Sequence, residues 1–375
     1  MGMFPSADQA LFAQTLDRFL GAAADPVRRR RVRATDAGFA EEDWVGFAEL
    51  GVLGLLVDES HGGSGGNASD AAIVMEAIGR HLYASPYFGT GVLGASLLAE
   101  APDEVKRALL PELVAGRHRV ALAHVEPQAR YDLADVATRA RRDGTGWRID
   151  GAKSLVHYAE AAKTLIVVAR TAGERRDRGG ICLFLVPADA KGLERRSYPT
   201  IDGLRASEVT LEAVRVGPEA VIGAPEAGLE LLERVADLGI AALLAEAVGA
   251  MTHLHDTTLG YLKTRKQFGA TLASFQALQH RMVDVFTQCE FARSMAAVAR
   301  LSLDADAATR AKEVSAAKLY VDRAARHVAQ ESIQLHGGMG MTDELDVGHY
   351  AKRLTMIGLT FGDRPHHLAR YHGVV

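Results

Sequence analysis

The stretch that decides the fold is Tyr261–Asp284, Y-L-K-T-R-K-Q-F-G-A-T-L-A-S-F-Q-A-L-Q-H-R-M-V-D. Arg265 offers a planar set of donors suited to a pyrophosphate, and Phe268 places an aromatic face beside it. Gly269 interrupts the helical pattern, which starts again at Gln276. The stretch therefore predicts two helices joined by a short segment that can contact a flat, phosphorylated ligand.

A second segment, Q-L-H-G-G-M-G at 334–340, belongs with the first. Gln334 can hydrogen-bond through both ends of its amide. Gly337 and Gly338 let the backbone approach a ligand closely. Taken singly, Arg265 could be a surface ion-pair partner and Gly337–Gly338 a helix C-cap. The combination favours a binding site.

Composition narrows the function classes. The chain has 375 residues, 48% hydrophobic and 24% charged, which is ordinary for a globular protein with a large core. A net charge of −4 gives no basis for nucleic-acid binding. Cys182 and Cys289 form neither a metal-binding spacing nor a disulfide framework, so we expect no metal site and a reducing cytoplasm. We also expect no membrane span and no signal peptide.

Periodicity divides the chain into three predicted domains. Residues 1–118 are helical, with apolar positions at helical spacing in 10–24 and 43–53 and a helix after an Asn67–Asp70 cap. Residues 119–225 contain short β-type runs and predict a β-barrel or sandwich. Residues 226–375 return to helices, near 228–264, 271–301 and 306–336, long enough for an antiparallel bundle.

Together these motifs resemble the acyl-CoA dehydrogenase family, flavoproteins that desaturate acyl-CoA thioesters. Three further segments agree in order: 51–66 (G-V-L-G-L-L-V-D-E-S-H-G-G-S-G-G), 123–132 (A-H-V-E-P-Q-A-R-Y-D) and 147–153 (W-R-I-D-G-A-K). The resemblance implies a mainly α fold with a central β-domain between an N-terminal helical domain and a C-terminal four-helix bundle. It also implies a homo- or hetero-oligomer, a dimer or tetramer, with an acyl-CoA substrate and an electron-transfer flavoprotein as acceptor.

The implied cofactor is FAD, held across a subunit interface. Residues that match the family's contacts to the ADP half of the neighbour's flavin are well represented: Arg265, Phe268, Gln276, Gln334, Gly337 and Gly338. The half that holds the isoalloxazine ring departs from the pattern. Val125 and Tyr131 stand where Thr and Ser are usual, and Leu155 and His157 stand where Trp and Thr are usual.

The usual catalytic base is also missing. The family's Y-E-G-T motif falls on F-G-D-R at 361–364, so the glutamate position is Gly362 and the following threonine position is Arg364. The alternative glutamate position is Gly239. Asp363 is the nearest substitute by register.

Two other acids are candidates for the base. Glu246 could also be a buried helix acid paired with an arginine, and Asp237 a surface acid. Asp363 itself could be a turn residue. His366 and His367 are expected to begin a solvated helix.

Three functions fit these motifs. This chain keeps the residues that would hold the ADP half of a neighbour's flavin but lacks the usual residues for its own isoalloxazine ring and the base. This pattern favours a subunit that acts with a catalytic partner, similar to the small subunits of bacterial steroid and dicarboxylic acyl-CoA dehydrogenases. The alternatives are a self-sufficient homo-oligomeric dehydrogenase with an atypical base and a flavin-dependent monooxygenase of the same fold.

Overall fold

The structure, a computed structural model, describes residues 6–224 and 227–374. The chain forms two compact units, which we call the sheet unit (31–71 and 84–239) and the helical unit (1–30, 72–83 and 240–375). The predicted division into three consecutive domains stays a prediction, and its boundary at 225/226 lies outside the described residues.

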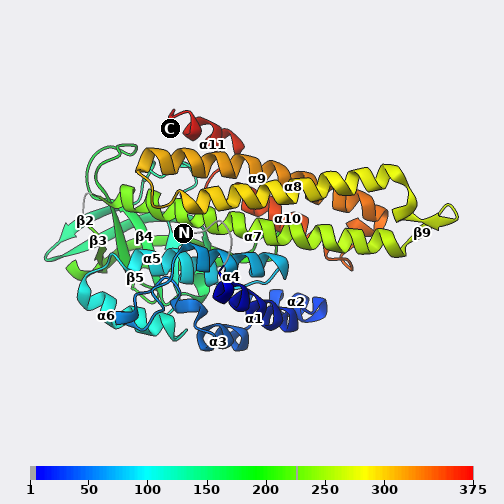
Figure 1. The fold of residues 1–375 in the computed structure, drawn as a ribbon. Coiled ribbons are helices and arrows are strands. Elements are labelled where there is room, and N and C mark those ends of the chain that lie inside the picture. Colours follow the sequence, from blue (N-terminus) through cyan, green and yellow to red (C-terminus); the bar gives the residue numbers. More distant parts are fainter. Residues whose placement is uncertain (1–5, 225–226, 375) are drawn as a thin grey trace. The chain divides into compact units, whose positions relative to one another are not determined.

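The sheet unit is built on one eight-stranded sheet with the order β6-β7-β3-β2-β4-β5-β8, and β1 pairs in parallel with β4 (Figure 1). Its strands are β1 (Val120–Ala123), β2 (Arg139–Asp143), β3 (Gly146–His157), β4 (Thr164–Arg170), β5 (Ile181–Pro187), β6 (Leu193–Pro199), β7 (Arg205–Val216) and β8 (Val221–Ile222). Every residue of β4 is buried, which explains its unbroken apolar run. Trp147 and Phe184 pack edge to face at 5.3 Å in the core of this sheet.

Short helices complete the sheet unit. They are α3 (Glu41–Glu49), α5 (Ala95–Leu98) and α6 (Asp103–Val114), with a π-helix at Phe88–Gly94. The helix expected over 43–53 stops at Glu49, because Gly51 adopts a left-handed φ of 71° that ends the helix before a 3-10 turn at Val52–Gly54.

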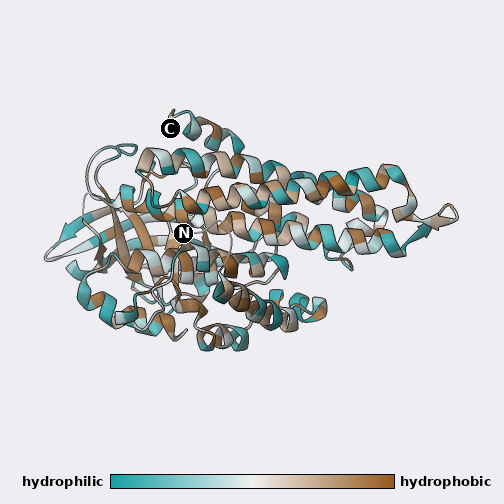
Figure 2. Cartoon of the chain, viewed as in Figure 1, coloured by the Kyte–Doolittle hydropathy of each residue, from teal (hydrophilic) through white to brown (hydrophobic). Residues whose placement is uncertain are grey.

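The helical unit contains α1 (Ala7–Ala23), α8 (Gln276–Leu301), α9 (Ala307–His336), α10 (Val347–Leu359) and α11 (Arg364–Tyr371). Three helices have residues in both units: α2 (Pro26–Arg33), α4 (Ala68–Arg80) and α7 (Gly228–Thr264). Asn67 and Asp70 cap α4 as predicted, since Asn67 Oδ1 accepts from the Ser69 N–H at 2.8 Å. In Figure 2 hydrophobic and hydrophilic residues alternate along the ribbons of the long helices, the pattern of helices that pack on one side.

Two glycines allow α4 and α7 to cross backbone against backbone. A Cβ on Gly79 would lie 1.9 Å from the Glu246 carbonyl oxygen, and a Cβ on Gly249 would lie 1.9 Å from the Glu76 carbonyl oxygen. Neither position can carry a side chain unless the helices separate. This reciprocal contact fixes where the two helices meet.

Helix α7 is long and apolar enough to span a membrane, contrary to the expectation that no run reaches that length. Its 18-residue window has a mean hydropathy of 1.6, but 89% of that window is buried inside the protein. Its apolar length is therefore used for packing within the fold.

A buried ion pair ties β3 to the loop before β2. Lys153 Nζ donates to Glu126 Oε1 at 2.6 Å, and the two side chains are 0% and 2% exposed. Glu126 also accepts from the backbone N–H groups of Ala137 and Thr138. Burial alone would raise the pKa of Glu126, but Lys153 and these hydrogen bonds outweigh it and lower the pKa to about 2. The loop is thus anchored through one carboxylate.

Polar groups are also buried between the C-terminal helices. His367 is fully buried, contrary to the expected solvated helix start. Its Nε2 lies 3.1 Å from the Phe361 carbonyl oxygen, and its Nδ1 lies 3.2 Å from Ser315 Oγ. Burial, followed by the positive charge of Lys318, lowers the pKa of His367 to about 2. The ring is therefore neutral, with Nε2–H donating to the carbonyl and Nδ1 accepting from the hydroxyl.

Replacing Lys153 with methionine should leave the Glu126 carboxylate buried without its counter-charge. We expect Lys153→Met to lower the free energy of unfolding by about 3–5 kcal/mol in urea titrations. Arg215→Met is the matched control, because Arg215 pairs with Asp143 on the surface, where such a pair contributes about 0–1 kcal/mol. Equal effects of the two substitutions would contradict the anchoring role.

The depressed pKa of His367 makes stability depend on pH. Because the folded state favours the neutral ring, its contribution is complete above the unfolded pKa of about 6.5 and is lost as pH falls toward 2, by up to about 1.4 kcal/mol per pH unit. Urea unfolding at pH 7.5 and 5 should show a smaller acid-side loss for His367→Asn than for the unmodified chain. The exposed His280 supplies the control, and the prediction fails if His280→Asn reduces the loss equally.

Candidate cofactor and catalytic site

One end of the helical unit brings together the ends of three helices. The Tyr261 ring, in the last turn of α7, stacks on His336 at the end of α9 with centroids 4.4 Å apart. Arg281, near the start of α8, forms an ion pair with Glu331 of α9. Between α7 and α8 the chain makes a small hairpin, β9 (Lys266–Gln267) and β10 (Ala270–Thr271), visible beyond the helix ends in Figure 1.

The hairpin displays two of the predicted site residues. Phe268 is 91% exposed and has a left-handed φ of 56°, and its ring meets Phe275 edge to face at 6.2 Å. Arg265 is exposed, and its guanidinium makes no ion pair or hydrogen bond with residues 6–224 or 227–374. The surface ion-pair alternative for Arg265 is therefore not what the structure shows, and its donors face solvent.

The remaining predicted residues lie at the same helix ends. Gln276 is the first residue of α8, and the exposed Gln334 is in the last turn of α9. Gly337 is the C-cap of α9 with φ 61°, so the C-cap interpretation is confirmed, and its role in binding stays a prediction. A Cβ on Gly337 or Gly338 would meet nothing within 4 Å, which leaves this surface open. The free guanidinium, the exposed ring and the open glycine backbone fit the ADP half of FAD.

The residues at the positions expected to contact the isoalloxazine ring have a different chemistry. The Ser154 N–H donates to the Val125 carbonyl at 2.9 Å, so β3 and the preceding loop lie side by side here. Leu155 has a left-handed φ of 52°, within a register shift of the β3–β7 pairing. Val125 and Leu155 are apolar, and Tyr131 and His157 bring larger groups than the usual hydroxyls.

Hydroxyls near these positions have other partners. Ser154 Oγ and Tyr198 Oη both donate to Glu208 at 2.7 Å. His124 beside this loop is neutral, because burial and then the charge of Lys153 lower its pKa to about 3. These residues do not supply the short donors expected for an isoalloxazine ring, so this side does not fit the cofactor as the ADP side does.

The segment at the usual base position is a tight turn between α10 and α11. Phe361 and Gly362 both have positive φ, 56° and 124°. A Cβ on Gly362 would lie 2.5 Å from His366 Cδ2 and 2.7 Å from His367 Nε2. Asp363 is the N-cap of α11, and its carboxylate accepts from the His366 N–H at 3.1 Å. A side chain at 362 would therefore require the imidazoles or the backbone to shift, and Asp363 has a capping role.

The other candidate acids are buried in helix α7. Glu246 forms a bidentate ion pair with Arg353 of α10 at 2.5 and 2.7 Å. It is therefore a buried helix acid paired with an arginine, one of the two interpretations given for it. Asp237 is 1% exposed, so the surface reading was wrong for it. Gly239 lies buried within the same helix.

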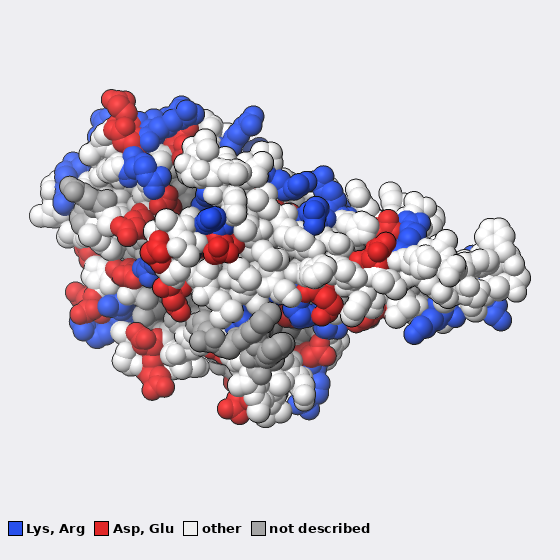
Figure 3. Space-filling view, turned by 45° about the horizontal axis from the view of Figure 1, so that its top comes forward, with Lys and Arg blue, Asp and Glu red and all other residues white. Residues whose placement is uncertain are grey.

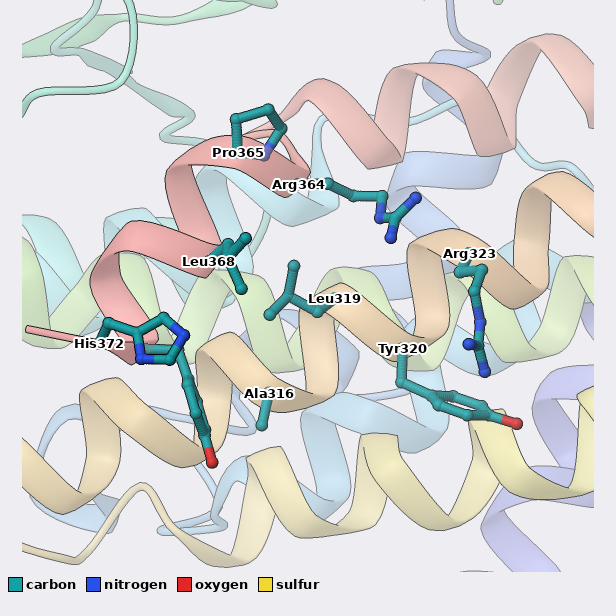
Figure 4. A pocket seen from close by; sticks show the side chains of 9 residues that line it. Ala316, Leu319, Tyr320, Arg323, Arg364, Pro365, Leu368 and His372 are labelled. Carbon is teal, nitrogen blue, oxygen red and sulfur yellow. The ribbon is translucent and has the colours of Figure 1, made fainter.

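Sequence reasoning missed a groove between α9 and α11. It has a volume of about 650 Å³ and is lined by the guanidiniums of Arg323 and Arg364 and by apolar side chains that include Leu319 and Leu368 (Figure 4). The Arg323 guanidinium lies 4.9 Å from the Tyr320 ring. Arg323 follows an ordinary helical spacing, so no sequence signal separates it from a solvated face. Arg364, at the usual threonine position, lines this groove.

Within the described ranges, no three His, Cys, Asp or Glu side chains gather to hold a metal ion. On the face shown in Figure 3, charges of both signs are interspersed and form no single-sign surface.

Comparison with known proteins places the whole chain. Family models for the acyl-CoA dehydrogenase N-terminal, middle and C-terminal domains match residues 6–117, 121–214 and 226–364. A probable acyl-CoA dehydrogenase of Bacillus subtilis, YngJ, is 33% identical over 307 residues, covering 80% of each chain. The long-chain specific acyl-CoA dehydrogenase of Sus scrofa is 29% identical over 341 residues, 89% of this chain and 79% of its own.

Solved structures agree. A variant of the Tcur3481–Tcur3483 steroid ACAD superimposes with a TM-score of 0.88 at 28% identity, covering 98% of this chain and 97% of the other. Butyryl-CoA dehydrogenase of Megasphaera elsdenii shares the fold, with a TM-score of 0.90 at 22% identity and coverage of 100% and 99%. The predicted fold class is confirmed, and the chain belongs to the acyl-CoA dehydrogenase family, FAD-dependent oxidoreductases that act on a CH–CH bond of acyl-CoA.

Proposed function

We propose that this chain is the base-lacking subunit of an acyl-CoA dehydrogenase made of two unlike chains. It lends its helix-end surface to the ADP half of FAD, and its partner supplies the ring-side contacts and the glutamate base. The observation that carries the proposal is the turn at Gly362, where a side chain would meet two imidazoles within 2.7 Å.

The reaction explains why a base is needed. The α-proton of an acyl-CoA is weakly acidic, so its removal takes a positioned carboxylate together with hydrogen bonds that polarise the thioester carbonyl. FAD, when bound, supplies the acceptor for the hydride that leaves Cβ. Neither Gly362 nor Gly239 can take the α-proton, and Glu246 is held by Arg353.

This chain's own residues serve binding. The Arg265 guanidinium can pair with the pyrophosphate, the Phe268 ring can stack on a flat group, and the backbone at Gly337–Gly338 admits a ligand without steric hindrance. All three are exposed on a single copy of the chain. They fit a cofactor shared between two chains.

The comparisons support a paired assembly. The solved structure at 28% identity carries two component names, Tcur3481 and Tcur3483, and is described as a steroid ACAD. We therefore propose a steroid acyl-CoA as the first substrate class to test, an electron-transfer flavoprotein as electron acceptor and a hetero-oligomer in the cytoplasm. A self-sufficient homo-oligomer remains the second candidate, because Asp363 lies one residue from the usual base position.

Purification of the chain alone separates the two candidates. We expect a protein without flavin absorbance that gains no acyl-CoA dehydrogenase activity on addition of FAD. One FAD per chain together with turnover would overturn the paired-subunit proposal in favour of the homo-oligomer.

Removal of the Arg265 guanidinium should weaken FAD retention in the FAD-containing assembly purified through this chain. A charge-assisted hydrogen bond contributes about 1.5–3 kcal/mol, so Arg265→Ala should raise the Kd for FAD roughly 10- to 100-fold. Equilibrium dialysis with flavin absorbance measures it. Arg107→Ala, at an exposed arginine of α6, is the control and should leave the Kd unchanged.

Asp363→Asn tests the remaining candidate base. Asn caps helices about as well as Asp, so the substitution removes basicity and keeps the α11 cap. We expect kcat of the assembly to stay within about twofold, since the capping role does not enter the chemistry. A fall of roughly 10² to 10⁴, the contribution of a positioned base, would identify Asp363 as catalytic.

A further inference from the structure

We infer that the imidazoles of His366 and His367 form a lock that holds the 361–363 turn in a conformation in which position 362 cannot carry a side chain. The inference rests on the proposed function only in taking position 362 as the site of the usual base. Its consequence is that the packing of these rings against the turn enforces the absence of the base. A single substitution at Gly362 therefore cannot restore it.

The lock begins with a hydrogen bond to the strained residue of the turn. Phe361 has a left-handed φ of 56°, which a bulky residue adopts only when its surroundings enforce it. The neutral His367 ring donates from Nε2 to the Phe361 carbonyl at 3.1 Å. This bond holds the carbonyl of the residue that precedes Gly362.

The His367 ring is also held through its other nitrogen. Ser315 of α9 is fully buried and donates to His367 Nδ1 at 3.2 Å, while Arg370 of α11 lies 3.5 Å from the Ser315 hydroxyl. The imidazole is 0% exposed, so it has no solvent-filled space into which to turn. A rigid ring therefore lies beneath the glycine.

The second ring closes the other side. His366 packs edge to face on His367 with centroids 5.1 Å apart, and its Cδ2 is the atom nearest to a Cβ at position 362. The Asp363 carboxylate accepts a hydrogen bond from the His366 backbone N–H at 3.1 Å, which fixes the position of His366 in the first turn of α11. The two rings together occupy the space that a side chain at 362 would need.

A double-mutant cycle tests the lock through stability alone. Gly362→Ala and Gly373→Ala are made in the unmodified chain and in a His366→Ala/His367→Asn background, and Tm is measured for each. Gly373 is the matched control, because it has φ 68° and a Cβ there would meet nothing within 4 Å. Backbone strain is common to both backgrounds, so the cycle isolates the contact with the rings.

We expect Gly362→Ala to lower Tm by several degrees more in the unmodified chain than in the background with shortened side chains. The drop caused by Gly373→Ala should be the same in both. An equal Gly362→Ala drop in the two backgrounds would overturn the inference, because the backbone alone would then exclude the side chain. If the double background does not fold, His366→Ala alone serves, since it removes the nearest contact and should relieve part of the drop.

Stability and function fail separately in this design. The lock can be refuted by Tm values while the chain still needs a partner for activity. Equally, the chain can prove active alone while the cycle still shows the coupling. Restoring a carboxylate extends the test: Gly362→Glu should keep a folded protein only together with the shortened histidines, and a stable single Gly362→Glu variant would also overturn the lock.

Discussion

The crossing of α4 and α7 is the constraint on which the helical unit depends. At Gly79 and Gly249 each helix presses against a carbonyl of the other, and those carbonyls belong to Glu246 and Glu76. Both glutamates then use their side chains to hold further helices, Glu246 through Arg353 of α10 and Glu76 through Arg293 of α8. A shift at the crossing would therefore move two ion pairs as well as the packing.

Buried acids in this chain can serve as structural supports. Glu246 is an acid within the core, yet its two oxygens are occupied by one guanidinium, so its role is to join helices. Glu126 acts in the same way in the sheet unit, where its buried pair with Lys153 anchors a loop. These two buried carboxylates hold the scaffold, while the predicted cofactor-binding residues Arg265 and Phe268 lie on the surface.

Much of the fold could be predicted from sequence, because long apolar periodicity and unbroken apolar strands are local signals. Strand β2 could not be predicted in the same way, because four of its five residues are charged and it contains no apolar run. The site residues at the helix ends followed from motif spacing, but the buried state of His367 did not. Its burial depends on Ser315 and Phe361, which lie 52 and 6 residues away, and no local pattern reports such contacts. The arginine groove is invisible for the same reason.

The exposed ring of Phe268 also bears on how the cell must produce this protein. Phe268 is 91% exposed at a hairpin tip and lies next to Phe275, which is 36% exposed. The two rings give an unassembled copy an exposed apolar surface. Such a surface favours chaperone binding or aggregation while it stays exposed. In the paired assembly proposed above, synthesis in matched amounts with the partner chain would keep the pool of unassembled copies small, so the hairpin would link the dosage of the protein to its assembly.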